Sequence, residues 1–443
     1  MKIHIKNGRV IDPLNGIDAT LDVFVAAGRI AALGPPPGGF SANRIIDASG
    51  SIVCPGVVDL AVRLREPGLE YKATLTSEML AAVAGGVTSL ACPPDTEPPL
   101  DEPGLVEMLK YRARSLNQCH VYPVGALTVG LEGLRLTEMA ELSDAGCVAF
   151  SQADARIDDT LVLLRAMQYS ATFGFKVWLR PQDAYLASDG KAHDGEVATR
   201  LGLAGIPACA ETIAVATALQ LARHTGASLH LCRLSSAASL DLVLEAKREG
   251  LPVTCDVAIN HLHLCDIDIG YFDSSCRLIP PLRGLRDRDR LRAALADGSV
   301  DALCSDHTPV DDDAKQLPFA EAEPGASGLE LLLPLTLKWA AEMRVPLLVA
   351  LSRITSDPAR VLGIDAGALT VNSVADVCIV DPLAAWKVEA KALKSQGKNT
   401  PFLGLEMQGR VRYTIVSGRV VYEWPPATHT SNTPPLGAEG VER

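Results

Sequence analysis

The stretch Pro55-Gly56-Val57-Val58-Asp59-Leu60-Ala61-Val62-Arg63-Leu64-Arg65-Glu66-Pro67-Gly68 is the most informative part of this chain. Its apolar start predicts a buried strand, and polar residues follow where that strand would end. Two residues at that end, Ala61 and Arg63, have side chains that cannot bind a metal ion. Alanine has no donor atom, whereas arginine stays protonated, offers only N–H groups and repels cations. We therefore expect these side chains to hold no metal.

Between residues 55 and 365, apolar strand-like runs alternate with helical patterns such as Thr212–His224 and Ala237–Arg248. The expected strands are Val57–Leu60, Ser89–Cys92, Val121–Ala126, Val148–Phe150, Lys176–Leu179, Ser228–Cys232, Val253–Val257 and Ala302–Ser305. Eight strands separated by helices predict an α/β fold, the (β/α)8 TIM barrel. Because chemistry in such barrels lies at the carboxyl ends of the strands, residues just after these runs are the candidate site residues.

Both ends of the chain have short alternating runs and tight turns instead of long helical patterns. Residues 1–54 and 366–423 are therefore expected to pair as one small β-sandwich domain beside the barrel of residues 55–365. The remaining residues, 424–443, are rich in Pro, Thr, Ser and Gly, which predicts a flexible tail.

Composition excludes several classes of partner. The chain has 443 residues, 48% hydrophobic and 21% charged, as in ordinary globular proteins. A net charge of −12 argues against nucleic acid or an anionic membrane as partner, and no apolar run is long enough to span a bilayer. Eleven cysteines without CxxC spacing predict buried free thiols in a reducing compartment, and the N-terminus lacks a signal peptide, so we expect a cytoplasmic protein.

Eight short motifs, in order, carry a resemblance to a known family. They are Pro55-Gly56-x-x-Asp59, Leu64–Gly68, Ala84–Thr88, Ile279–Arg283, Cys304–Pro309, Gly325–Glu330, Asn399-Thr400-Pro401-Phe402-x-Gly404 and Val416–Tyr422. With these, the chain resembles dihydroorotases of the amidohydrolase superfamily along almost its whole length. Active members interconvert carbamoyl aspartate and dihydroorotate in pyrimidine synthesis and activate water on one or two zinc ions.

The resemblance implies where the metal ligands should stand. The family uses His-x-His after the first strand, a carboxylated Lys or an Asp, two single His and a final Asp. In this chain the corresponding residues are Ala61, Arg63, Gln152, Arg180, Arg233 and Asp306. Asp154 lies close to Gln152 and leaves the position of the bridging carboxylate open. Only Asp306 is retained, as a vestige of the ligand and general base, so we expect the family zinc to be absent.

Histidines near these positions are expected to be structural. His230 falls on the opposite face of its strand from Arg233, His261 matches a family position outside the metal shell, and His307 follows Asp306 as a non-ligand. The pair His261-Leu262-His263 has the spacing of a metal pair but follows the seventh strand, not the first.

The replacements share a direction, because Arg63, Arg180 and Arg233 all stand where the family has histidine. Together with Arg65 and Arg283 they are expected to crowd the barrel mouth with positive charge. Two unit charges 4 Å apart repel by roughly 4 kcal/mol at an effective dielectric near 20, which disfavours a further dication.

Two interpretations of this charge stay open. In one, the arginines fill the volume of the metals, with Asp306 and Asp183 as counter-ions. In the other, Arg63, Arg180 and Arg233 form a pocket for an anion such as a carboxylate or phosphate.

The family's substrate contacts are also altered. By resemblance, Arg65 is a vestige of the group that grips the substrate carboxylate, and Arg283 is a further candidate contact. The family's Pro-Asn-Thr element is Pro94-Asp95-Thr96 here, and its Asn before Pro-Pro-Leu-Arg is replaced by Ile279. An aspartate at position 95 would repel a carboxylate.

These observations favour a catalytically inactive dihydroorotase homologue. By resemblance, such chains are structural subunits of aspartate transcarbamoylase, and we expect a hetero-oligomer with its catalytic chain, or a homodimer when alone. One alternative is an active cyclic amidohydrolase with a rearranged metal site, for example at Asp306 and His261. A second alternative is a sensor of anionic metabolites.

Overall fold

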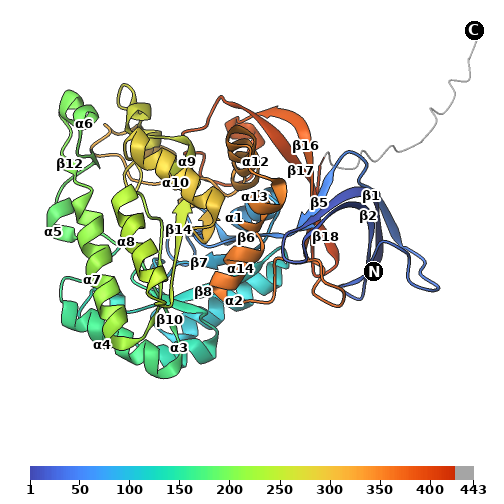
Figure 1. The fold of residues 1–443 in the computed structure, drawn as a ribbon, viewed down its shortest axis with the longest axis horizontal. Coiled ribbons are helices and arrows are strands. Elements are labelled where there is room, and N and C mark those ends of the chain that lie inside the picture. Colours follow the sequence, from blue (N-terminus) through green and yellow to red (C-terminus); the bar gives the residue numbers. More distant parts are fainter. Residues whose placement is uncertain (425–443) are drawn as a thin grey trace, which may run out of the picture.

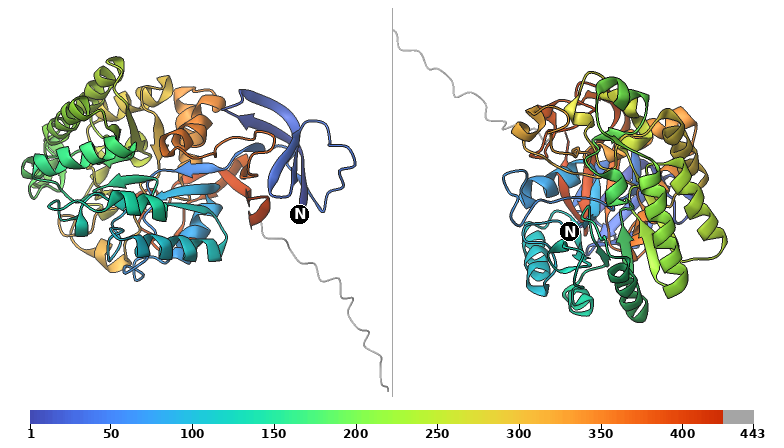
Figure 2. Two further views of the ribbon diagram at one scale, coloured as in Figure 1. Left: turned by 90° about the horizontal axis from the view of Figure 1, so that it is seen from below. Right: turned by 90° about the vertical axis from the view of Figure 1, so that its left-hand side faces the viewer.

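The computed structural model describes residues 1–424 of the chain. It has two parts, a large barrel surrounded by helices and a smaller β-rich domain that projects from one side (Figures 1 and 2). The expected tail of residues 424–443 lies, apart from Trp424, outside the described residues.

Eight parallel strands form the barrel, in the order β15-β14-β13-β10-β9-β8-β7-β6. Their bounds are β6 Val57–Asp59, β7 Val87–Cys92, β8 His120–Ala126, β9 Ala149–Ser151, β10 Lys176–Leu179, β13 Ser228–Leu231, β14 Val253–Ala258 and β15 Ala302–Cys304. Because every strand expected from the sequence has its counterpart here, the prediction of a (β/α)8 barrel is confirmed.

The barrel closes where its first and last strands end. The backbone of Val62, after β6, forms a parallel bridge with His307, after β15. In this bridge the Arg63 amide donates to the His307 carbonyl at 3.0 Å, and the His307 amide donates to the Ala61 carbonyl at 2.9 Å. The closure therefore brings the residues just after β6 against those just after β15.

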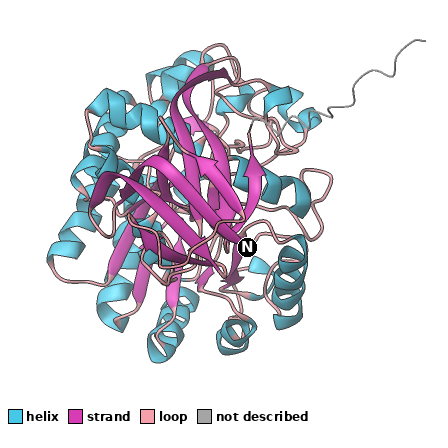
Figure 3. Cartoon of the chain, turned by 90° about the vertical axis from the view of Figure 1, so that its right-hand side faces the viewer, coloured by secondary structure: helices cyan, strands magenta, loops and turns pink. Residues whose placement is uncertain are grey.

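Helices cover the outside of the barrel (Figures 1 and 3). They are α1 Leu75–Ala84, α2 Pro103–Leu116, α3 Met139–Ala145, α4 Thr160–Phe173, α5 Ala184–Ala187, α6 Glu196–Leu201, α7 Cys209–Thr225, α8 Ala237–Arg248, α9 Asn260–His263, α10 Leu285–Asp297, α11 Asp312–Gln316, α12 Leu332–Met343, α13 Leu347–Ser352 and α14 Ser356–Leu362. Within residues 1–424, no helix combines the length and apolar character needed to cross a membrane.

Strands from both termini build the β-rich domain, where the blue and red ribbons lie together (Figure 1). They are β1 Lys2–Asp12, β2 Ile17–Ala26, β3 Arg29–Leu33, β4 Arg44–Asp47, β5 Ile52–Pro55, β16 Val377–Lys387, β17 Glu406–Val416 and β18 Arg419–Glu423. They form one hydrogen-bonded network instead of two separate sheets, because β1 pairs with β2, β4 and β5 and because β5 also pairs with β16. The β5–β16 pair joins the two ends of the chain.

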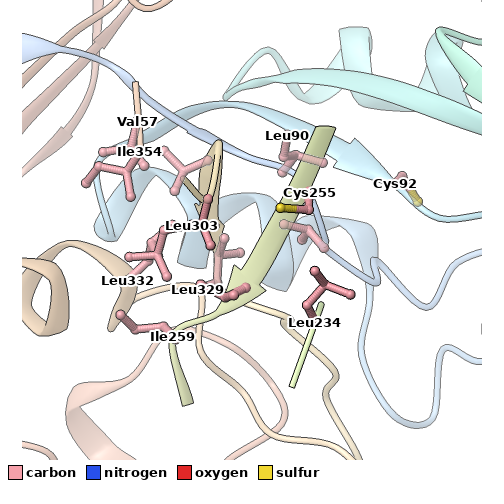
Figure 4. Close-up of a cluster of buried hydrophobic side chains, with 14 of the residues drawn as sticks. Val57, Leu90, Cys92, Leu234, Cys255, Ile259, Leu303, Leu329, Leu332 and Ile354 are labelled. Atoms are coloured by element: carbon pink, nitrogen blue, oxygen red, sulfur yellow. The ribbon is translucent and has the colours of Figure 1, made fainter. Parts of the chain in front are cut away.

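Part of the terminal strands packs into the barrel's hydrophobic core, and the β-rich domain also has a core cluster of its own that includes Ile3, Val23 and Ile415. Figure 4 shows barrel residues of the first of these clusters, among them Val57, Leu90 and Leu303. The same cluster includes Ile52 of β5, and Phe402, which precedes β17 and is only 2% exposed. Since apolar residues from the ends of the chain lie inside the barrel's core, we infer that the two parts unfold together.

Replacement of Phe402 by alanine tests this shared core. Truncating a buried phenylalanine costs about 3–5 kcal/mol through lost burial and a cavity. We expect Phe402→Ala to lower the urea midpoint of one cooperative transition, measured by circular dichroism and fluorescence. Leu403→Ala is the matched control, because Leu403 is 43% exposed and should change stability by less than about 0.5 kcal/mol. Separate transitions for the two parts in the unaltered chain would contradict the shared core.

Candidate functional site

Three arginines and three aspartates meet where the barrel strands end, and we call them the Arg–Asp cluster. Its members are Arg63, Asp95, Asp154, Arg180, Arg233 and Asp306. They follow β6, β7, β9, β10, β13 and β15, so six of the eight strands contribute one residue each. The cluster thus ties most of the barrel mouth together.

Arg63 makes four side-chain contacts. Its Nε donates to Asp95 at 2.6 Å and its Nη2 donates to Asp154 at 2.6 Å. Its Nη1 donates to Thr308 Oγ1 at 2.9 Å and lies 3.3 Å from Asp306 Oδ1. With only 4% of the residue exposed, this guanidinium is buried and its donors are occupied.

Arg233 completes a bridge across the barrel. Its Nη1 donates to Asp306 Oδ1 at 2.7 Å, and its Nη2 donates to Asp154 Oδ1 at 2.6 Å. Asp154 therefore accepts from Arg63 through Oδ2 and from Arg233 through Oδ1. The backbone N–H of Arg233 donates to Asp256 Oδ1 at 2.6 Å, which fixes the loop that carries the side chain.

Arg180 lies against the outer side of the same carboxylate. Its Nε is 2.5 Å from Asp154 Oδ1, at an angle unsuited to a hydrogen bond. Its Nη2 donates to the Asp154 carbonyl at 3.2 Å, and its Nη1 donates to Gln182 at 2.7 Å. Asp154 is thus in contact with all three arginines.

Burial and ion pairing set the charges of the cluster. Burial by itself would raise the pKa of Asp154, but Arg233, Arg63 and Arg180 hold that pKa well below its usual range. Burial lowers the pKa of an arginine, yet the neighbouring carboxylates outweigh it and raise the pKa of Arg63 and Arg233. Burial raises the pKa of Asp306, opposed by Arg233 and Arg63.

The cluster has no formal excess of positive charge, because three guanidinium groups face three carboxylates. A cavity of about 620 Å³, lined by Gln152, Asp154 and Arg180 among others, opens on one side of the cluster, whereas the cavity at its centre, lined by Ala61, Arg63 and Arg233, measures about 30 Å³. That volume suits one or two water molecules. The arginine side chains therefore fill the centre of the barrel mouth.

The backbone is strained at several residues that adjoin the cluster. Ala153, Arg233 and Asp306 have φ of 50°, 55° and 49°, and Arg65 has φ of 61°. A left-handed conformation in a residue other than glycine costs on the order of 1–3 kcal/mol and persists only where surrounding contacts fix it. Here the ion pairs of Arg233 and Asp306 are such contacts.

Arg65 and Arg283, which were expected to add charge at the barrel mouth, have partners elsewhere. Arg65 donates through Nε to the Pro309 carbonyl at 3.0 Å. Arg283 donates to the Ile206 carbonyl at 2.8 Å and lies 3.7 Å from the buried carboxylate of Glu211. Both groups are held by structural partners outside the cluster, although burial and the nearby charge of Arg63 lower the pKa of Arg65.

Gln152 and Asp183 also take local roles. Gln152 donates to the Leu131 carbonyl at 2.8 Å and accepts from Thr128 at 3.0 Å. Of the residues after β9, it is therefore Asp154 and not Gln152 that enters the cluster. Asp183, expected as a counter-ion, instead caps α5 by accepting from the Leu186 amide at 2.8 Å. The counter-ions of the arginines are Asp95, Asp154 and Asp306.

The histidines have partners of their own. His307 Nε2 lies 2.6 Å from Glu78, with both residues fully buried. His261 Nε2 lies 3.2 Å from the Pro281 carbonyl and His263 Nε2 lies 3.0 Å from the Leu335 carbonyl, so the two rings point to different partners. Burial lowers the pKa of each to about 4, which keeps both neutral.

One group of residues was not anticipated from the sequence. His230, Cys232 and Asp256 lie close together in the barrel, with His230 Nε2 2.9 Å from Asp256 Oδ2. Asp256 also accepts from the Arg233 backbone, so it positions the loop of the cluster. The sequence signal was the spacing His230-x-Cys232 across the end of β13, beside Asp256 on β14.

Comparisons with known proteins agree with this architecture. The family described as Dihydro-orotase-like matches residues 50–239, and the Amidohydrolase family matches residues 204–422. A "Dihydroorotase-like protein" from Pseudomonas putida is 46% identical over 422 residues, which cover 95% of this chain and 99% of the relative. The chain belongs to the dihydroorotase-like proteins of the amidohydrolase family.

Other relatives of similar length are named either "Dihydroorotase-like protein" or "Dihydroorotase". A "Dihydroorotase-like protein" of Pseudomonas aeruginosa PAO1 is 44% identical, and a "Dihydroorotase" of Geobacter sp. strain M21 is 42% identical, each covering 96% of this chain and all of the relative. Among solved structures, the L-hydantoinase of Arthrobacter aurescens has a TM-score of 0.85 at 26% identity, covering 95% of this chain and 96% of that one.

The residues of this dihydroorotase-like chain do not fit the zinc that its fold family implies. Zinc needs neutral imidazole, thiolate or carboxylate donors, whereas Arg63 and Arg233 present cations to Asp154 and Asp306. Within residues 1–424, Asp306 belongs to no group of three converging His, Cys, Asp or Glu side chains. A dication at Asp306 would have to displace two paired guanidinium groups.

Replacement of Asp154 tests whether this carboxylate holds the cluster together. Asp154→Asn leaves Arg63 and Arg233 short of a partner, and we expect a loss of about 3 kcal/mol, the lower end for a broken buried pair because the Asp154 side chain is 30% exposed. Asp158→Asn is the matched control. It removes only the exposed pair with Arg156, which contributes about 0–1 kcal/mol. Denaturant unfolding at pH 7 measures both.

The stabilisation lost in Asp154→Asn should also depend on pH. Since pairing lowers the folded-state pKa of Asp154, its stabilisation is present above the unfolded pKa, about 3.9, and is lost as the pH falls below it. We therefore expect the stability difference between the unaltered chain and Asp154→Asn to shrink below about pH 4. A difference that stays constant down to pH 2 would contradict an ionised Asp154.

Proposed function

We propose that this dihydroorotase-like protein is catalytically inactive and acts as a structural subunit. The observation that carries this proposal is the double pairing of Arg63 and Arg233 with Asp154 and Asp306. The carboxylates that could bind a cation are occupied by the chain's own guanidinium groups. A guanidinium neither lowers the pKa of a bound water as zinc does nor accepts a proton.

The cluster also explains how the barrel mouth remains ordered. In a metal site, shared carboxylates link loops through the ion, and here Asp154 links the loops after β6, β10 and β13 through arginines. Three planar cations thus supply cross-links without supplying a Lewis acid. This retains the shape of the barrel and removes the means of activating water.

The pairing within the cluster favours neither alternative. For an anion sensor, the three arginines already face three aspartates, so an incoming carboxylate or phosphate would meet no unpaired cation at the centre of the cluster. For a rearranged metal site, Asp306 is bound to Arg233 and His261 lies beside the Pro281 carbonyl.

The proposed partner is the catalytic chain of aspartate transcarbamoylase. The support is the resemblance to inactive dihydroorotase-like chains, together with a full-length fold whose site lacks the family's ligands. A (β/α)8 barrel with a shared core provides a large rigid surface on which another enzyme can assemble.

Metal binding and turnover test the loss of catalysis. We expect the purified chain to bind no stoichiometric zinc and to leave dihydroorotate intact, beside an active dihydroorotase as positive control. Arg63→His alone should not recover zinc, because Ala61, Arg180 and Arg233 still supply no ligand. Elemental analysis after dialysis against zinc measures this. One zinc per chain in that single variant would show that the ligand count is wrong.

Association with the catalytic chain tests the structural role. We expect a mixture of this chain and the aspartate transcarbamoylase catalytic chain of the same organism to sediment as one larger species in analytical ultracentrifugation at micromolar concentration. Each chain alone gives the reference. Two independent boundaries with unchanged sedimentation coefficients would refute the partner.

A further inference from the structure

The segment between α9 and α10 exposes an unusual amount of apolar surface. Residues 264–276, called the Tyr271 loop below, contain Ile267, Tyr271 and Phe272 with exposed fractions of 54%, 93% and 38%. The loop follows β14, on the side of the barrel toward which the β14 arrow points (Figure 1). Single exposed apolar residues are ordinary, but three within six positions form a patch.

This exposure is built into an ordered loop. Ile269 is 2% exposed and anchors the loop in a small core. The Cys265 amide donates to Asp268 Oδ2 at 2.8 Å, and the Asp273 amide donates to the Ile269 carbonyl at 2.9 Å. Ser274 Oγ donates to the Lys315 carbonyl at 2.5 Å, which ties the loop to α11. The apolar side chains are therefore presented on a fixed backbone.

The backbone at the tip of the loop is strained at Phe272. Phe272 has φ of 64°, a left-handed conformation that is an outlier for a bulky residue. Its ring packs edge-on against Tyr271, with centroids 5.5 Å apart and an interplanar angle of 76°. Strain of this kind is found at binding sites more often than elsewhere.

The charges near the patch limit the kind of partner that it could bind. The exposed acidic groups of the loop are Asp268 and Asp273, since Asp266 is buried, and Lys315 of α11 donates to the Ser274 carbonyl of the loop at 3.0 Å. An anionic lipid surface would be repelled by these carboxylates. A protein pocket that is apolar at its base and edged with lysine or arginine complements both features of the loop.

We infer that the Tyr271 loop docks into such a basic-edged apolar pocket on a partner polypeptide. The inference rests on the proposed structural role, because the partner meant is the chain assembled on this barrel. Tyrosine is among the residues that most often dominate binding energy, and its two side-chain rotations cost little entropy on docking. Three side chains are too few for a whole interface of about 800 Å² per partner, so the loop is the centre of a larger contact.

Binding of the aspartate transcarbamoylase catalytic chain to variants of the full-length protein tests this. Tyr271→Ala removes an almost fully exposed ring, so folding should be unaffected. We expect its Kd, measured by sedimentation or calorimetry, to rise about tenfold or more. Tyr111→Ala is the matched control. Tyr111 is 73% exposed on α2, which lies between β7 and β8, across the barrel from β14. Its Kd should stay within about twofold of the unaltered chain.

Two further measurements separate the outcomes. Affinity should fall as salt rises, since the paired charges are screened. Hydrogen exchange of residues 264–276 should slow in the complex. If the unaltered chain binds but Tyr271→Ala binds equally well, or loses no more than Tyr111→Ala, the docking inference is overturned while the structural role stands. If the unaltered chain does not bind, the proposed function and the inference built on it both fail.

Discussion

The carboxylate of Asp154 is the contact on which the barrel mouth depends. One oxygen accepts from Arg233 and the other from Arg63, while Arg180 lies against the same group. Because these arginines follow three different strands, one side chain links loops that are far apart in the sequence. The depressed pKa of Asp154 keeps its charge at physiological pH, so the arginines remain neutralised although they are buried.

Buried ion pairs of this kind serve geometry more than stability. Taking charges out of water is costly, and their mutual attraction often does no more than offset that cost. What the pairs provide is direction, since a planar guanidinium with two parallel donors accepts few arrangements of its carboxylates. In this chain the directed ion pairs hold the barrel mouth in an amidohydrolase-like shape, with guanidinium groups where the family has metal ligands. Under the proposed structural role, the ordered Tyr271 loop is a surface through which the chain would contact its partner.

Much of the fold could be predicted because its signals are local. Runs such as Lys176–Leu179 are apolar over the length of a buried strand, and β10 has these bounds. The pairing of chain ends was also visible, since turn-rich runs occur at both termini. The site was less accessible to prediction. Asp183 was expected as a counter-ion together with Asp306, but it lies at a helix start and caps α5. Arg283 looked like a mouth residue, but Glu211, far away in sequence, attracts it.

The sequence by itself placed arginines after the strands at positions 63, 180 and 233, and its resemblance to dihydroorotases implied that these cations replace imidazoles; neither step needs coordinates. It also determined the alternation of strands and helices, because apolar periodicity is written locally along the chain. Only the tertiary structure decided which aspartate faces which arginine, since ion pairs form between loops whose separation is set by barrel closure. It alone decided that Tyr271 stands in solvent, because exposure depends on what the rest of the chain leaves uncovered.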